Sequence, residues 1–189
     1  MPSTRRMLLP AIAIALASST AALGATLTVP STHRTLADAL AEARPGDLIE
    51  VQPGIYREHD LVVAAAVTIR GLGGQAADVV IDGGGRGRIM ACENVAGPIV
   101  LQNLTFRGGA PEGNSTRQQS GGAIFVSRSE LVAQNCRFED NTAAANGGAL
   151  RFVAAGGRVT QCAFVGNRAT FGGGAIDCSY GSSPHIERC

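Results

Sequence analysis

Three residues whose side chains could do chemistry recur at a constant spacing. Phe125, Arg151 and Asp177 are 26 residues apart, and each is the second residue after a Gly-Gly-Ala triplet. If each triplet opens an equivalent strand, side-chain alternation turns the residue directly after the triplet inward and these three outward. An aromatic ring, a guanidinium and a carboxylate on one exposed face could bind a sugar. We therefore predict a binding column of Phe125, Arg151 and Asp177, with Arg151 and Asp177 also the candidate catalytic residues.

The same residues allow an interpretation without function, a surface ion pair beside an exposed ring, which is worth about 0–1 kcal/mol. Glycoside hydrolysis usually needs two carboxyl groups about 5–9.5 Å apart, and Asp177 is the only acid on the predicted face. A calcium-dependent lyase would need several carboxylates among about 6–8 oxygen ligands, and the sequence shows no such cluster. We therefore predict no metal, no cofactor, and binding in preference to catalysis.

The elements that would position this column form an internal repeat. Gly122, Gly148 and Gly174 mark the triplets, and a second element with the pattern Cys-x-Phe-x-x-Asn, at 136–141 and 162–167, keeps the same step. A fixed period in this range is typical of a solenoid. The preceding interval, from Phe106 to Phe138, is 32 residues because the loop 109–120 is longer.

Stacked coils place equivalent residues about 4.8 Å apart and so form columns of like side chains. We expect a buried aromatic column, a column containing cysteines, and a ladder of corner asparagines. Packing explains the cysteines better than a disulfide or metal ladder, because the typical Cβ–Cβ distance in a disulfide is about 3.8 Å. The three columns are, in order, Phe106, Phe138 and Phe164; Leu104, Cys136, Cys162 and Cys189; and Asn141 and Asn167.

The N-terminal part differs from the repeats. Thr35 is a candidate N-cap for a short amphipathic helix over residues 36–43, which would cover the open end of the first coil. Short β-branched runs follow at 48–51, 61–63, 67–70 and 79–82 without helices between them. Residues 71–76 fit the Gly-x-Gly-x-x-Ala pattern of a dinucleotide site, but a strand restarts at Val79 where that site needs a helix. We interpret residues 71–76 as a turn.

The N-terminal residues indicate the cellular location of the protein. Arg5 and Arg6 precede an apolar run at 7–17 and small residues up to Gly24, which is typical of a secretory signal peptide over residues 1–24. The rest of the chain, with 14 basic and 15 acidic residues, is near neutral, which argues against a nucleic-acid partner. No other stretch approaches the roughly 20 apolar residues of a spanning helix, so we predict no transmembrane segment in the mature chain.

The organisation that follows is a signal peptide (1–24), an N-terminal cap with the first coils (25–97), and repeat coils (98–189) of which the last is incomplete. The fold class is all-β, a right-handed single-stranded parallel β-helix with a short N-terminal capping helix. We expect export, to the periplasm, the outer membrane or the exterior.

Several motifs resemble a known group of proteins. The helix residues before Pro45-Gly46-Asp47, the segment 53–56, and the paired Phe-x-x-Asn and Gly-Gly-Ala-(Ile/Leu) elements resemble exported parallel β-helix proteins of the pectate-lyase-like superfamily. Within it, the paired elements are most similar to polymorphic outer membrane protein repeats, as found in adhesins and autotransporter passengers. Gly109 departs from the pattern, since it stands where later coils have Asn141 and Asn167.

The resemblance implies an exported, noncatalytic surface scaffold or adhesin-like protein whose partner is a polysaccharide or a host or cell-surface ligand. The alternative is a truncated or divergent polysaccharide lyase or glycosidase that uses Arg151 and Asp177. Relatives of this fold that cleave polysaccharides carry their catalytic groups on the corresponding face.

Overall fold

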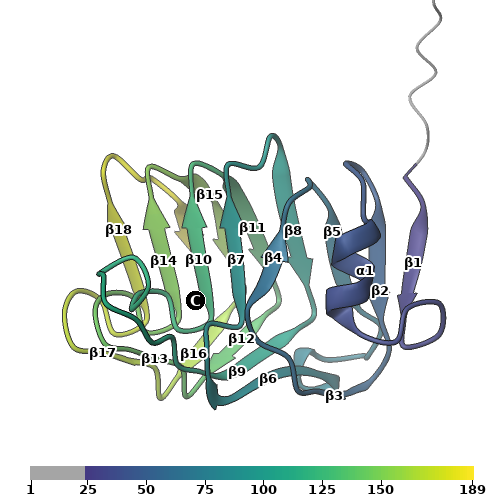
Figure 1. The fold of residues 1–189 in the computed structure, drawn as a ribbon, viewed down its shortest axis with the longest axis horizontal. Helices are drawn as coiled ribbons and strands as arrows, with labels where there is room; N and C mark the ends of the chain where they lie inside the picture. The colour runs from purple at the N-terminus through teal and green to yellow at the C-terminus, as the bar shows by residue number, and fades with distance from the viewer. Residues whose placement is uncertain (1–23) are drawn as a thin grey trace, which may run out of the picture.

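The computed structural model describes residues 24–189, and all but the last residue of the predicted signal peptide lie outside them. The chain winds into stacked coils of short parallel strands, with one α-helix near the N-terminal end of the stack (Figure 1). Within the described residues every strand pair is parallel, and in the repeat coils each residue lies directly opposite its equivalent in the next coil. The β6–β9 pair, in the earlier coils, has an irregular register between Asp82 and Arg86. The predicted parallel β-helix with an N-terminal helix is confirmed.

Three main sheets, which we call sheets A, B and C, form the walls of the coil. Sheet A has the order β1-β2-β5-β8-β11-β15-β19. Its strands are β1 (Thr26–Val29), β2 (Leu48–Val51), β5 (Thr68–Gly71), β8 (Pro98–Gln102), β11 (Glu130–Gln134), β15 (Gly156–Thr160) and β19 (His185–Glu187).

Sheets B and C each have five strands. Strands of sheets A, B and C follow one another along the chain, so each coil passes through the three sheets in turn. Sheet B contains β3 (Gly54–Tyr56), β6 (Val79–Arg86), β9 (Thr105–Gly109), β12 (Arg137–Glu139) and β16 (Ala163–Val165). Sheet C contains β4 (Leu61–Val63), β7 (Met90–Glu93), β10 (Ile124–Ser127), β14 (Leu150–Val153) and β18 (Ile176–Ser179). The short strands β13 (Thr142–Ala143) and β17 (Arg168–Ala169) pair between B and C, and a 3-10 turn, η1 (Ala76–Asp78), precedes β6.

The predicted columns fill the interior. The rings of Phe106 and Phe138 stack with centroids 5.4 Å apart, and those of Phe138 and Phe164 are 4.9 Å apart. Cys136 and Cys162 are buried, and each thiol contacts a backbone carbonyl of the preceding coil. All five cysteines are free thiols, so the cysteine column packs as predicted and forms no disulfide.

Corners between sheets repeat the same backbone conformation in successive coils. Asn103, Asn135 and Gln161 all have φ between 50° and 55°, the left-handed region that Asn tolerates better than most residues. At the next corner, Asn141 Oδ1 accepts from the Gly109 amide at 2.9 Å, and Asn141 Nδ2 donates to Asn167 Oδ1 at 3.0 Å. The expected asparagine ladder is confirmed, and Gly109 joins it through its backbone.

The two glycines of each triplet have different tasks. Gly147 has φ +66°, where an L side chain is strained. A Cβ on Gly148 would lie 2.0 Å from the carbonyl oxygen of Gly174 in the next coil. The triplet is therefore a tight corner followed by a close backbone contact between coils, and it leads directly into sheet C.

The helix α1 (Leu36–Glu42) covers the N-terminal end of the stack. Thr35 and Asp38 form a capping box, in which each side chain accepts a hydrogen bond from the other's backbone amide. Leu36, Ala39 and Leu40 are buried against the first coil. The helix closes the core as predicted, whereas in the last described coil Phe164 and Ile176 are only partly buried.

Candidate functional site

The predicted binding column exists in the expected register. Phe125 in β10 lies directly opposite Arg151 in β14, which lies opposite Asp177 in β18. Their chain neighbours Ile124 and Leu150 are fully buried in the core, so the three side chains emerge on the outer face of sheet C.

The expectation that this column is exposed is wrong for two of its members. Phe125 is 2% exposed and Arg151 is 7% exposed, while Asp177 is half-buried. The residues face outward from the coil, but neighbouring side chains and the loop 110–120 cover them. The column is therefore the floor of a site and does not form a flat strip.

Arg88 provides much of this cover. Its guanidinium lies 4.8 Å from the centre of the Phe125 ring, and that of Arg117, from the loop, lies 5.8 Å from the same point. Such cation–π contacts contribute about 0.5–2 kcal/mol. Burial lowers the pKa of Arg88 to about 10, so this guanidinium stays charged at neutral pH.

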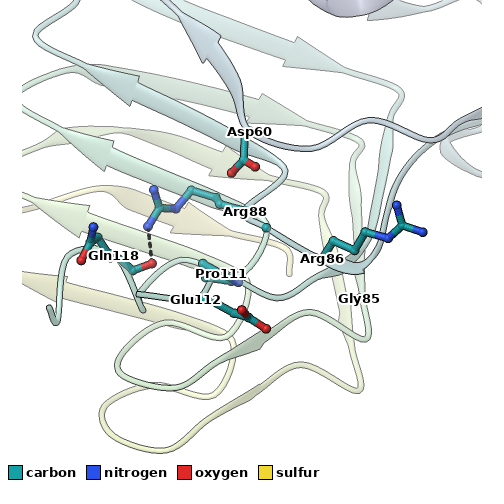
Figure 2. A pocket seen from close by; sticks show the side chains of 8 residues that line it. Asp60, Gly85, Arg86, Arg88, Pro111, Glu112 and Gln118 are labelled. Carbon is teal, nitrogen blue, oxygen red and sulfur yellow. Dashed lines mark hydrogen bonds between the residues drawn. The ribbon is translucent and has the colours of Figure 1, made fainter. Parts of the chain in front are cut away.

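Arg88 also holds the loop against the sheet. Its Nη2 donates to the carbonyl oxygens of Arg117, Gln118 and Ser120 at 2.7, 3.1 and 2.8 Å, and its Nε donates to Ser120 and Gly121. Figure 2 shows the guanidinium directed toward Gln118, with the nearby Arg86 pointing the opposite way. A planar fork with several donors suits this arrangement of backbone acceptors.

Arg151 is held within the column. It forms an ion pair with Asp177 in the next coil, and its Nη2 donates to Ser179 Oγ at 2.9 Å. Burial lowers the pKa of Arg151. The pair links β14 to β18 across the outer face and leaves the Arg151 side chain bordering a groove.

The groove lies between the loop and the C-terminal corner of sheet C. Its volume is about 550 Å³, which falls within the range of small-molecule sites. Phe125 and Val153 supply apolar surface, and Tyr180, 81% exposed, stands at the edge. The remaining lining side chains are polar: Glu93, Ser115, Thr116, Arg117, Ser120, Ser127, Arg128 and Arg151.

Positive charge predominates around the groove. Arg117 binds Glu93 through both carboxylate oxygens, each 2.6 Å from Nη2. Arg128 donates from Nε to the neutral amide of Asn94 at 2.6 Å. The floor, lining and cover together carry four guanidiniums, of Arg88, Arg117, Arg128 and Arg151, and two carboxylates, of Glu93 and Asp177.

The two carboxylates do not form an acid–base pair. Glu93 is in β7 and Asp177 in β18, three strands apart in sheet C, so their strands are separated by about 14 Å. This exceeds the 5–9.5 Å or so that glycosidases use. Each carboxylate is also bound by a guanidinium of its own.

A second hollow lies on the other side of Arg88 and has a volume of about 450 Å³. In Figure 2, Asp60 and Glu112 lie on opposite sides of the Arg88 side chain, so the two carboxylates do not converge. Within residues 24–189, no group of three His, Cys, Asp or Glu side chains could hold a metal ion. None of the helices in this part of the chain is long and apolar enough to cross a membrane.

Residues 135–152 match the family described as the Chlamydia polymorphic membrane protein (Chlamydia_PMP) repeat. The matched segment runs from the Asn135 corner through β12 of sheet B and the Asn141 ladder into β14 of sheet C. The match points to a surface or outer membrane protein. No curated protein and no solved structure matches the chain.

The site predicted from the sequence did not include Arg88, Arg117, Glu93, Arg128 and Tyr180. The pairing of Met90 with Ile124 places Arg88 at the coil position of Gly122, but the first coils lack the triplet that would have shown this alignment. The extended loop, which contains Arg117, was visible as the interval of 32 residues. The sequence did not show that this loop folds back over Phe125.

Proposed function

We propose that this protein is an exported, noncatalytic β-helix surface scaffold, adhesin-like in role, which binds carbohydrate in the groove on sheet C. We also place it, as a proposal, in the pectate-lyase-like superfamily. Export is supported by the charged and apolar segments at 5–17. A location at the cell surface agrees with the repeat match.

The observation that carries the proposal is the composition of the groove. It combines a solvent-facing aromatic ring, Tyr180, with many hydroxyl and guanidinium donors in about 550 Å³. Sugars present hydroxyl groups around an apolar ring face, and an aromatic side chain beside hydrogen-bonding groups offers complementary surfaces for both. The parallel stack beneath keeps these groups on rigid strands.

The arrangement favours binding over hydrolysis. The two acids near the groove are widely separated, and both are engaged by arginines. A carboxylate held as the acceptor of an ion pair is poorly suited to donate a proton to a leaving group.

The test is a glycan array probed with the exported chain, residues 25–189. We expect saturable binding of a subset of glycans without any product. Replacing Tyr180 by Ala should weaken that binding about tenfold, whereas Tyr180→Phe should retain most of it because the ring remains. If no glycan binds, or if both variants bind like wild type, the groove is not a carbohydrate site.

A second candidate function is polysaccharide cleavage by a lyase. The observation in its favour is that Arg151, the catalytic candidate, borders the groove on the outer face of sheet C. An assay for unsaturated product from polygalacturonate and related uronans tests it. Turnover that disappears in Arg151→Ala would replace the noncatalytic proposal with this one.

A further inference from the structure

We propose that the groove on sheet C selects an anionic glycan and holds its charged group, a carboxylate or a sulfate ester, between Arg117 and Arg128. This inference rests on the proposed carbohydrate function and specifies the ligand class. It does not concern catalysis, since the two arginines are distinct from the Arg151–Asp177 pair.

The charge balance of the groove is the first support. Arg151 is neutralised by Asp177, and Glu93 is the only acid that lines the groove itself. Arg117 and Arg128 thus share one carboxylate between them. A cavity with a net positive wall attracts anions, and guanidinium groups match the planar geometry of carboxylate and the oxygens of sulfate.

Arg128 is a guanidinium at the groove that is not paired with a carboxylate in the described part of the chain. It occupies the left-handed corner directly after β10, with φ 46°, and its side chain is exposed at the groove. Its Nε contacts the neutral Asn94 amide, and within residues 24–189 it makes no ion pair. Its terminal nitrogens can therefore bind a ligand anion without breaking a charged contact.

Arg117 is the guanidinium that an anion can reach by competition. Its side chain is 63% exposed although it is paired with Glu93. Because the Arg117 guanidinium is exposed at the groove, a ligand anion can share it with Glu93 or displace the Glu93 contact. Glu93 would then act as a competitor, and its removal should strengthen binding of the ligand.

Polar groups beside the two arginines suit the uncharged part of the same ligand. The hydroxyl groups of Ser115 and Thr116, on the loop next to Arg117, border the groove, and Tyr180 does so from the opposite side. A glycan spanning these groups would place its ring near Tyr180 and its charged substituent near Arg117 and Arg128. The site therefore recognises both the charged group and the sugar ring of the same ligand.

The experiment compares ligands that differ only in charge. Binding of residues 25–189 is measured by calorimetry with dextran sulfate against dextran, and with oligogalacturonate against its methyl ester. We expect the charged member of at least one pair to bind at least about tenfold more tightly, and the two pairs distinguish sulfate from carboxylate. Equal binding within both pairs would overturn the inference but leave carbohydrate binding intact, whereas absence of any binding would remove the proposed function itself.

Two variants with opposite expected effects separate the site from general electrostatics. Arg128→Gln should weaken binding of the charged ligand about tenfold, the effect of losing one charge-assisted contact, while Glu93→Gln should strengthen it severalfold. The matched controls are Arg158→Gln and Glu130→Gln, which make the same charge changes at exposed positions of sheet A. If each control shifts the affinity as much as its partner, or if Glu93→Gln weakens binding, the anion does not sit between these arginines.

Discussion

The guanidinium of Arg88 lies 4.8 Å from the centre of the Phe125 ring, although the two residues belong to adjacent coils. Arg88 also joins the regular solenoid to the long loop 110–120. Arg88 covers the ring and at the same time donates to the carbonyl groups of Arg117, Gln118, Ser120 and Gly121. The shape of the groove therefore depends on a residue outside the repeat motif.

Replacing Arg88 by Ala should release the loop. Several charge-assisted hydrogen bonds and the contact with Phe125 are lost, so we expect about 2–3 kcal/mol of destabilisation. Trypsin cleavage after Arg117 should become much faster, which mass spectrometry measures directly. Arg86→Ala is the control, because Arg86 is exposed and points away from the loop. Equal cleavage of both variants would show that Arg88 does not anchor this segment.

The aromatic column should stabilise the fold unequally along its length. Phe138 is fully buried between two other rings, whereas Phe164 is partly buried at the last described coil. Phe138→Ala should cost about 3–5 kcal/mol, and Phe164→Ala distinctly less. Urea unfolding followed by circular dichroism gives both values. A larger loss at Phe164 would mean that stability is concentrated in the last coils.

The corner ladder should depend strongly on Asn141. Its buried side chain donates to Phe106 O at 3.0 Å and accepts from the Gly109 amide at 2.9 Å. Asn141→Ala would leave buried polar groups without partners, at a cost of about 1–3 kcal/mol. Asn167→Ala, at a more exposed corner, should cost less in the same unfolding experiment. Equal costs would argue that the ladder acts through turn propensity alone.

The buried thiol of Cys92 should make the protein sensitive to alkaline pH. Burial raises the pKa of Cys92 from 9.0 to about 12, so the unfolded chain loses this proton first as pH rises. The free energy of unfolding should therefore be unaffected below about pH 8 and should fall by about 1.4 kcal/mol by pH 10 from this group. Cys92→Val removes the thiol. The difference in unfolding free energy between wild type and variant should shift by that amount between pH 8 and pH 10, and a constant difference would contradict the assignment.

Much of the coil could be predicted because each structural requirement recurs with the period. The left-handed corners at Asn103, Asn135 and Gln161, the close approach at Gly148 and the stacked rings are all local needs that parallel, in-register strands impose on every coil. When the same structural requirement recurs in every coil, the same type of residue recurs in the sequence. The register of Phe125, Arg151 and Asp177 followed from the same logic.

The surroundings of that column could not be predicted in this way. Arg88 takes the coil position of a glycine and contacts residues about 30 positions away through a loop that breaks the period. Nothing local in the sequence encodes where such a loop returns.

The sequence by itself therefore determined the solenoid, its register and which face carries the candidate residues, because in a parallel stack neighbours in space are equivalents in the repeat. Only the tertiary structure decided that this face is a covered, positively charged groove. That outcome depends on one non-repeating loop and on the arginine that holds it, whose contacts are long-range and specific.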